Sequence, residues 1–440
     1  LALAAALAAT LGLGACAPLP PPGAVTQPPA APGTPAAPSA HPERISREPV
    51  LDIALAVDRD TLTIAPRDRM EATLQQAAGR GSASVVEKPF VVLTGHDPNP
   101  GEEVVDGHPA FRLLPGDTLR VGEPTDVRAR LGWNGHTWRG GFKAFVSPRG
   151  KLTLCARVPL ETYLLGVVPG EIGQLTPELI EAGKAQAIAA RSFTLFYLGR
   201  RGREGFDLYG TVEDQVYGPL ESERPLATRV VQETRGLTAL SGGAPIRANY
   251  CSTCGGITAE VWEAWPEAPE RYLVSLRDAS SAGADWCASS PLHRWREEWT
   301  PEEFVSDIQR YGPPAGVPMP RDGIGALVDV RVASRSRSGR VWRLDVIGSA
   351  GSVRIPSWSL RGVLRRGGHP EMILRSNLFK IAVRRDPATR RALAVVASGA
   401  GSGHGVGLCQ TGALGMARAG ERSDAIVTHY YPGVELRRLY

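Results

Sequence analysis

The sequence has no long hydrophobic run: beyond its first residues, no stretch of the 440-residue chain approaches the length that a membrane-spanning helix needs. It also has no dense block of Lys and Arg interleaved with aromatic residues, so nucleic acid is not an expected partner. The HExxH motif of zinc proteases and the G-x-S-x-G motif of serine hydrolases are both absent. The net charge of +5 suits work near an anionic surface or polymer, but it does not specify one.

The apolar run at residues 1–16, LALAAALAATLGLGAC, ends in small residues, as the core of an export signal does. Its last four residues, LGAC, are similar to a bacterial lipobox, so we predict a lipoprotein signal peptide with lipidation at Cys16. An ordinary signal peptide followed by a chance cysteine is the alternative. We therefore expect an exported protein anchored in a membrane by its lipid. In a Gram-negative cell it would lie on the periplasmic face of the outer membrane, and otherwise on the outer face of the cell membrane.

Residues 17–48 are rich in proline and alanine, a composition that favours extended polyproline II and predicts a semi-rigid tether. Residues 49–154 then show alternating or apolar runs of strand length separated by Gly, Asp and Pro. This pattern predicts a β-rich N-terminal domain. Within it, only RDRMEATLQQAA at 67–78 is predicted to be helical.

From residue 155 the pattern becomes mixed, and we predict an α+β fold in which a mixed α/β region at 155–440 carries a substrate groove. The stretch VPLETYLLGVV predicts a short helix that ends at the break formed by Pro169 and Gly170. A second, longer helix is predicted to begin at Thr176.

Glu171 is therefore expected in the connection between two helices, a rigid support on which functional side chains are often placed. Its neighbours Glu161 and Glu178 lie inside the predicted helices, and we interpret both as solvated or first-turn acids. From the residues alone, Glu171 is either a turn carboxylate or the acid of an active site.

Motifs in the second part of the chain occur in a fixed order: VPLETYLLGVVPGEIG with EAGKAQAIAARSFTL, then DQVYG, YCSTCGGITAEVW, GSGHGVGLCQTGALGMARAG and HYYPGVEL. Together they resemble the SpoIID/LytB family of bacterial wall proteins over residues 155–440. The resemblance implies a lytic transglycosylase that cleaves peptidoglycan glycan strands stripped of their stem peptides. In that family the glutamate of the VVP-x-E motif is the catalytic acid, and here it is Glu171.

One carboxylate is sufficient for this chemistry. Cleavage of a glycosidic bond needs an acid that protonates the leaving oxygen, and hydrolases usually need a second carboxylate as base or nucleophile. In a transglycosylase, the sugar's own 6-hydroxyl attacks the anomeric carbon and closes a 1,6-anhydro ring. The same carboxylate can then act first as acid and afterwards as base.

The glycine-rich motif GSGHGVGLCQTGALG is a candidate glycan-binding loop. Glycines such as Gly403 and Gly405 would let a polysaccharide approach the backbone while His404 projects into the groove. Alternatively, His404 only hydrogen-bonds its own loop. Gln410 is a candidate sugar-binding residue or a loop brace. Thr411 stands where the family usually has Trp, which would reduce a sugar-stacking surface.

The motif DLYGTVEDQVYG contains two more candidate substrate-binding residues, Gln215 and Tyr217. They would line the groove or, equally, belong to a β-edge that braces the catalytic helix pair. Some relatives carry zinc-binding cysteines in this stretch, where this sequence has Leu208 and Asp214, so no metal site is expected there.

Five cysteines remain after Cys16: Cys155, Cys251, Cys254, Cys287 and Cys409. A structural disulfide between Cys254 and Cys287 is the simplest expectation for an exported protein. The alternatives are a structural zinc ion at Cys251, Cys254 and Cys287, with His293 as a fourth ligand, or free thiols. We expect the other two cysteines to be buried thiols, and no other cofactor is expected.

Two rival functions remain from this reading. One is a non-catalytic glycan-binding enhancer of a cell-wall amidase, the activity described for LytB-type members, and the other is a structural lipoprotein that bridges membrane and wall. The expected partners are peptidoglycan glycan strands, a cell-wall amidase, and the membrane through the lipid anchor. Glu171 favours catalysis, whereas the missing Trp at position 411 argues against ordinary substrate handling.

Overall fold

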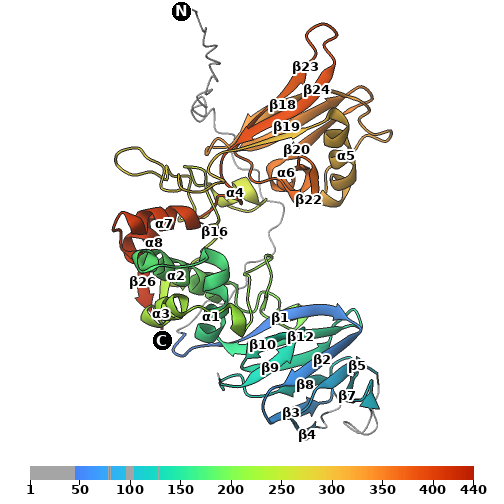
Figure 1. Ribbon diagram of the computed structural model, residues 1–440, viewed down its shortest axis with the longest axis vertical. Helices are drawn as coiled ribbons and strands as arrows, with labels where there is room; N and C mark the ends of the chain where they lie inside the picture. Colours follow the sequence, from blue (N-terminus) through green and yellow to red (C-terminus); the bar gives the residue numbers. More distant parts are fainter. Residues whose placement is uncertain (1–44, 78, 80, 96–103, 127) are drawn as a thin grey trace, which may run out of the picture.

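The computed structural model describes residues 45–77, 79, 81–95, 104–126 and 128–440. The predicted signal peptide with Cys16, and most of the predicted tether, lie outside the described residues. Within the described part of the chain, no helix is both long and apolar enough to cross a membrane. The fold is mixed α+β, with β-rich sheets first and a mixed α/β region after them, as predicted (Figure 1).

The N-terminal part is built from two sheets that share one core (Figure 1). The first has the strand order β13-β1-β12-β11-β8-β3-β4 and the second the order β10-β9-β2-β5-β7-β6. The strands are β1 (Val50–Arg59), β2 (Thr61–Pro66), β3 (Met70–Gln75), β4 (Gly81–Val86), β5 (Phe90–Thr94), β6 (Val104–Val105), β7 (His108–Leu113), β8 (Thr118–Val121), β9 (Arg130–Trp133), β10 (His136–Arg139), β11 (Gly141–Val146), β12 (Leu152–Pro159) and β13 (Leu208–Tyr209).

The helix predicted at residues 67–78 is wrong, because residues 70–75 form strand β3. Its side chains alternate: Met70, Ala72 and Leu74 are buried, and the residues between them point outward or are half-buried. β3 pairs with β4 on one side and β8 on the other. Good helix formers such as Met, Glu and Ala therefore adopt a strand here because a period-2 apolar face is buried against the sheet.

Strand β12 leads directly into helix α1 (Leu160–Ile172), so the sheet supports the helix without an intervening loop. The predicted domain boundary at residue 155 falls inside this strand. One continuous core extends from the N-terminal sheets through α1 and into the helices that follow. The helix that carries Glu171 is consequently packed on both sides.

The central part of the chain gathers helices around α1 and α2, and the C-terminal helices α7 and α8 lie beside α2 (Figure 1). Strand β26 pairs with β14, which brings the C-terminus back to this part. The elements are α2 (Ile180–Tyr197), α3 (Pro225–Glu233), β14 (Leu237–Ser241), β15 (Ala244–Pro245), β16 (Tyr250–Cys251), α4 (Val261–Ala264), β25 (Leu408–Cys409), α7 (Gln410–Arg418), α8 (Ser423–Tyr430), β26 (Glu435–Arg438), and short 3-10 turns at Pro177–Leu179, Gly202–Glu204 and Leu220–Ser222.

Between these central elements the chain forms a separate unit with its own hydrophobic core (Figure 1). The predicted 155–440 region thus contains two cores, a division that its sequence pattern did not reveal. The elements of this unit are β17 (Trp295–Trp299), α5 (Pro301–Tyr311), a 3-10 turn at Pro313–Ala315, β18 (Leu327–Arg335), β19 (Val341–Gly348), β20 (Ser352–Pro356), α6 (Ser357–Val363), β21 (Arg365–Arg366), β22 (His369–Ile373), β23 (Phe379–Arg385) and β24 (Ala392–Gly399).

The unit contacts the central part through the turn that joins β18 to β19. The Arg340 guanidinium, nearly fully buried, donates from Nη2 to the carbonyl oxygens of Cys254 at 3.0 Å and Ile257 at 3.1 Å. In the same turn, Ser336 Oγ donates to the buried carboxylate of Glu263 at 2.5 Å. Buried polar groups that are paired in this way hold the two parts in a fixed arrangement.

Helix α1 does not end at Pro169, contrary to the prediction. Pro169 lies inside it, and the helix continues to Ile172 before Gly173 ends it with a φ of 76°. The proline ring has a φ that a helix tolerates, and packing of the buried face of α1 outweighs the single lost backbone hydrogen bond. Glu171 therefore lies in the last turn of a helix and not in a loop.

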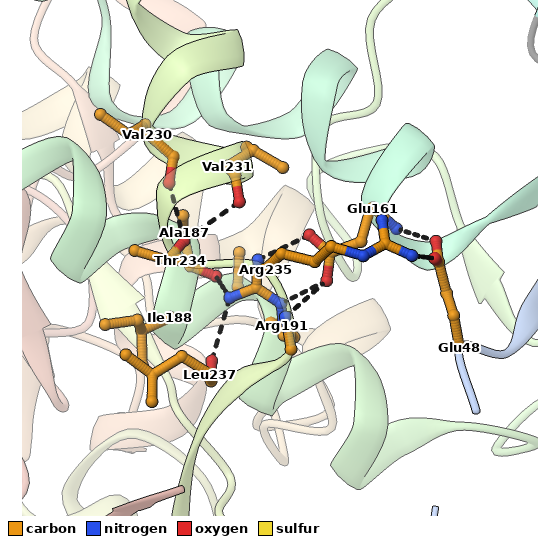
Figure 2. Close-up of polar contacts among 12 residues, drawn as sticks. Glu48, Glu161, Ala187, Ile188, Arg191, Val230, Val231, Thr234, Arg235 and Leu237 are labelled. Carbon is orange, nitrogen blue, oxygen red and sulfur yellow. Dashed lines mark hydrogen bonds and ion pairs between the residues drawn. The ribbon is translucent and has the colours of Figure 1, made fainter. Parts of the chain in front are cut away.

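A buried ion pair joins the start of α1 to the middle of α2 (Figure 2). Arg191, fully buried, donates from Nε to Glu161 Oε1 at 2.8 Å and from Nη2 to Oε2 at 2.7 Å. Glu161 also accepts from Gly236 N at 3.1 Å and from Tyr440 Oη at 2.7 Å. Glu161 is a first-turn acid of α1, one of the two predicted alternatives, but it is buried and not solvated, whereas Glu178 is exposed as expected.

Candidate active site

Glu171 lies at the C-terminal end of α1, half-buried, with both carboxylate oxygens engaged. Oε1 accepts from the backbone N–H of Val216 at 3.1 Å. Oε2 accepts from Gln410 Nε2 at 3.3 Å, and the Tyr250 hydroxyl also hydrogen-bonds the carboxylate. Three donors from segments far apart in the chain therefore converge on one acid.

Burial raises the pKa of Glu171 above its ordinary value. The hydrogen bonds from Val216, Gln410 and Tyr250 favour the charged form and oppose this effect, but they offset only part of it. Among the described residues, no carboxylate is paired with Glu171, and no Lys or Arg forms an ion pair with it. A single acid with a raised pKa retains more of its proton near neutral pH than an exposed glutamate does, which suits a general acid.

Gln215 lies behind the acid and holds Tyr250 in position. Its side chain is buried, its Oε1 accepts from Thr194 Oγ1 at 2.7 Å and Tyr163 Oη at 3.2 Å, and its Nε2 donates to Tyr250 Oη at 2.9 Å. All of these contacts are internal. Gln215 thus reaches Glu171 through Tyr250, from a loop and not from the predicted β-edge.

Tyr217 is also packed inside the protein. Its ring centroid lies 5.0 Å from that of Tyr163 on α1 and 5.3 Å from that of Trp138 on β10. The chain directly after Tyr217 approaches α1 closely, and Gly218 N donates to the Gly166 carbonyl oxygen at 3.1 Å. A Cβ at Gly166 would overlap Gly218. Tyr217 therefore joins the helix to the N-terminal sheet, also from this loop.

His404 is half-buried and engaged with its own surroundings. Its Nδ1 accepts from the backbone N–H of Val406 at 3.0 Å, and its ring lies 4.9 Å from Trp265. Burial and then the nearby Arg361 guanidinium lower the pKa of His404 to about 3. The ring also hydrogen-bonds the backbone of Tyr250. As a neutral group, it supports the loop that carries Tyr250.

The glycines of the GSGHGVG loop face the protein's own chain. A Cβ at Gly403, where φ is 106°, would lie 3.0 Å from the Cβ of Cys251. At Gly405, where φ is 83°, a Cβ would overlap the Arg340 guanidinium. Both residues therefore allow close packing inside the protein in a backbone conformation that other residues rarely adopt.

Thr411, at the position of the family's usual Trp, begins helix α7 beside Gln410. Its backbone N–H and its Oγ1 both donate to the Ser252 carbonyl oxygen, at 3.0 and 2.9 Å. The side chain thereby ties α7 to the segment that follows Tyr250. A polar brace occupies this position in place of a ring.

The cysteine predictions need a correction. Cys254 and Cys287 are neighbours as expected, but their Sγ atoms lie 3.7 Å apart and all five described cysteines are free thiols, so the predicted disulfide is absent from this structure. Cys251 does not belong to the group of possible metal ligands that Cys254 and Cys287 form. His293 instead bonds Asp285, with Nε2 2.8 Å from Oδ2. Cys155 and Cys409 are buried thiols, as predicted.

Sequence reasoning missed two parts of this site, Tyr250 and the backbone N–H of Val216. Tyr250 is the first residue of YCSTCGGITAEVW, one of the motifs that resemble the SpoIID/LytB family, and this position was the one indication of a functional role. Val216 contributes only its backbone, so its side chain carries no signal. Both become apparent only when β16 and the 210–218 loop are placed against α1.

Comparisons with known proteins match this part of the chain. Residues 148–240 match the family model of SpoIID, described as stage II sporulation protein, and residues 282–407 match a domain of unknown function, DUF8618. The first match extends from β12 into β14 and includes Glu171. The second covers the separate unit and the loop with His404.

The similar proteins are distant relatives. The chain is 26% identical over 295 residues to stage II sporulation protein D of Bacillus subtilis, covering 63% of this chain and 74% of that protein. It is 25% identical over 297 residues to an uncharacterized protein of Brachyspira hyodysenteriae, covering 67% of this chain and 71% of that one. It is also 25% identical over 306 residues to the amidase enhancer of Bacillus subtilis, covering 62% of this chain but 40% of that protein.

Proposed function

Because the chain carries a SpoIID domain and is distantly homologous to stage II sporulation protein D and the amidase enhancer, we propose a function in the bacterial cell wall. Specifically, we propose that it is a lytic transglycosylase that cleaves peptidoglycan glycan strands to 1,6-anhydro products. Glu171 is its single acid, and strands stripped of stem peptides are its substrate.

The observation that supports this proposal is the setting of Glu171: a partly buried acid with a raised pKa, held by three donors and without a carboxylate partner among the described residues. A retaining hydrolase would need a second carboxylate about 5 Å from the first, and an inverting one at about 6.5–9.5 Å. A transglycosylase needs neither, because the substrate supplies the nucleophile.

The reaction can be written with Glu171 alone. The protonated carboxyl donates its proton to the glycosidic oxygen as the bond to the anomeric carbon breaks. The 6-hydroxyl of the same sugar forms the new bond to that carbon, and the Glu171 carboxylate takes the hydroxyl proton. The acid returns to its starting state, and no water is consumed.

Val216, Gln410 and Tyr250 act on Glu171 in this scheme. Their hydrogen bonds fix the orientation of the carboxylate and stabilise its charged form after proton donation. Gln410 is the candidate that a substrate hydroxyl would displace, because its 3.3 Å contact with the carboxylate is longer than the 3.1 Å contact from Val216 N.

The test uses purified protein with amidase-treated and intact peptidoglycan, and mass spectrometry of the released fragments. We expect fragments lighter by one water than hydrolysis products from the denuded strands. Glu171→Gln should reduce their release at least about 100-fold, because a positioned acid contributes that much or more. Glu178→Gln, a change of an exposed carboxylate, is the matched control and should leave release unchanged. Fragments of hydrolytic mass would refute the transglycosylase scheme.

A second candidate function is supported by the amidase-enhancer relative and by Thr411, which replaces a sugar-stacking ring with a polar brace. In this role the protein would bind glycan strands and increase the activity of a cell-wall amidase without cutting them. The same experiment separates the two functions. Retention on denuded glycan without released fragments, together with faster amidase turnover, would favour the enhancer.

Either function requires access to the wall, so we propose that the protein works outside the cytoplasm and is held by a lipid on Cys16. Metabolic labelling with a clickable fatty acid tests the anchor. Label should enter the wild-type protein and not a Cys16→Ala variant. Label that persists in the variant would contradict this anchor.

A further inference from the structure

Three cysteines and one aspartate form a buried cluster next to the candidate active site. The Sγ atoms of Cys254, Cys287 and Cys409 and a carboxylate oxygen of Asp278 all lie within 4.8 Å of one another, and all four residues are buried. We propose that this cluster is a structural zinc site with three thiolate ligands and one carboxylate ligand. The proposal goes beyond the glycan chemistry and does not depend on it.

The spacing of the donor atoms fits a tetrahedral ion. Zinc binds thiolate sulfur at about 2.3 Å, so two sulfurs of a tetrahedral site lie about 3.8 Å apart. The Sγ atoms of Cys254 and Cys287 are 3.7 Å apart. Cys254 Sγ lies 3.0 Å from Asp278 Oδ2, which places the carboxylate on the same side of the cluster. Three soft sulfur donors with one oxygen favour zinc over magnesium or calcium, which prefer oxygen ligands.

The carboxylate of Asp278 turns one oxygen toward the cluster, where Oδ2 accepts a hydrogen bond from the Cys254 thiol at 3.0 Å. Its Oδ1 accepts from Tyr430 Oη at 2.9 Å and lies 3.1 Å from His429 Nε2, so Oδ2 alone faces the thiols. Such outer hydrogen bonds are typical of metal-binding carboxylates. Within the described part of the chain, no Lys or Arg forms an ion pair with this fully buried acid. A buried carboxylate is normally paired, bound to a metal or neutralised, and a zinc ion at Oδ2 would compensate its charge beside His429.

Backbone N–H groups donate to two of the three sulfurs. Cys409 Sγ accepts from Cys254 N at 3.1 Å and from Gly412 N at 3.3 Å, and Cys254 Sγ accepts from Gly256 N at 3.3 Å. A Cβ at Gly412 would overlap the Tyr430 hydroxyl and lie 2.7 Å from Asp278 Oδ2. Glycine at this position therefore leaves room for the first turn of α7 to close over the cluster.

The position of the cluster explains what the ion would do. Cys287 precedes the separate unit that begins at β17, and Cys409 follows the end of that unit at β24. The ion would join the two chain segments that lead into and out of the separate unit to Cys254, in the segment after β16. Strands β16 and β25 pair in parallel, and Tyr250 lies in β16 while Gln410 directly follows β25. The bound ion would therefore also hold in place these two side chains, which hydrogen-bond Glu171.

The direct test is metal analysis of the purified full-length chain, prepared with reductant and without chelator. We expect one zinc ion per chain, and replacement by cobalt(II) should give the thiolate-to-metal absorption bands of a tetrahedral sulfur site. Cys287→Ser should lose the ion, whereas Cys155→Ala, which removes a buried thiol outside the cluster, should retain it. Tyr430→Phe, which removes one hydrogen bond to Asp278, should weaken zinc binding about 10- to 100-fold.

Three results would overturn the proposal. The first is a wild-type chain that contains no zinc and takes up neither zinc nor cobalt after reduction. The second is a Cys254–Cys287 cross-link, found by peptide mass spectrometry, that re-forms in the presence of zinc. The third is full zinc content in Cys287→Ser, which would place the ion elsewhere. If the serine variant does not fold, the cobalt spectrum of the wild-type chain decides the question alone.

Discussion

Replacement of Glu161 by glutamine would test how the helix that carries the acid is held. The change keeps the shape of the side chain but removes its charge. Arg191, fully buried, would then keep only the Leu237 and Ala187 carbonyl oxygens and the amide oxygen as partners. Removing one partner of a buried, bidentate ion pair costs about 3–5 kcal/mol because the other charge is left uncompensated.

Hydrogen exchange measured by mass spectrometry is the suitable assay, because a chain with two hydrophobic cores need not unfold in one step. Peptides from α1 and α2 should exchange faster by roughly 100-fold or more, which is what about 3 kcal/mol corresponds to. Peptides from β18 and β19, in the separate core, should be unaffected. The effect should thus be confined to the helices that the pair joins.

A control and a pH series make the reasoning refutable. Arg229→Gln breaks the exposed ion pair with Glu233 and should change the opening free energy derived from exchange by no more than about 0.5 kcal/mol. Burial acts to raise the pKa of Glu161, but Arg191 outweighs it and holds that pKa below its ordinary value of 4.5. The stabilisation is therefore present above pH 4.5 and is lost as pH falls through the lower, folded-state pKa.

The difference between Glu161→Gln and the wild type should accordingly shrink in acid. A change of less than about fivefold in the exchange of α1 and α2 at pH 7 would refute the reasoning. So would a difference that grows as pH falls. Either result would mean that the surrounding dipoles, and not the paired charge, satisfy Arg191.

Other predictions follow from the same contacts. Burial raises the pKa of Glu171, so the stability that this group contributes is present below its ordinary pKa and is lost as pH rises through the folded-state pKa. Glu171→Gln should therefore raise Tm at pH 8 by about 1–3 °C. An unchanged or lower Tm would contradict this. Gly407→Ala should lower the free energy of unfolding by about 3 kcal/mol or more, because a Cβ would overlap the Asn249 carbonyl oxygen. Gly243→Ala, also at positive φ but in open space, should lower it by about 1 kcal/mol. Equal losses in thermal unfolding would refute the clash. The His404 ring, with its pKa lowered to about 3, should stay neutral from pH 5 to 8 in an NMR titration, and a midpoint near 6.5 would contradict its burial.

Local sequence pattern predicted elements well where propensity and burial agree. Thr300 is the N-cap of helix α5 and forms a reciprocal capping box with Glu303, the arrangement that a Thr three residues before a Glu favours. Local sequence pattern gave wrong predictions at β3, where strong helix formers form a strand of a sheet, and at Pro169, where α1 continues past a residue that usually ends a helix. In both places tertiary contacts outweigh preferences worth about 1–3 kcal/mol.

For the site, sequence by itself determined which residues carry distinctive chemistry. Glu171 and Gln410 stand in recognisable motifs, and the structure brings their side chains into contact although 239 positions separate them. The motifs could not say that Gln215 and Tyr217 are buried behind the site, because burial depends on what packs against a loop and not on the loop itself.

Only the tertiary structure decided which polar groups meet. Glu161 has the same local setting as an exposed first-turn acid, yet Arg191 and the C-terminal Tyr440 enclose it. The C-x-x-C spacing drew attention to Cys251, whereas the fold gathers Cys409, 155 positions beyond Cys254, and Asp278. Spacing along the chain constrains distance only over a few residues, and ion pairs, acid settings and metal ligands are set by distances in space between segments that the core brings together.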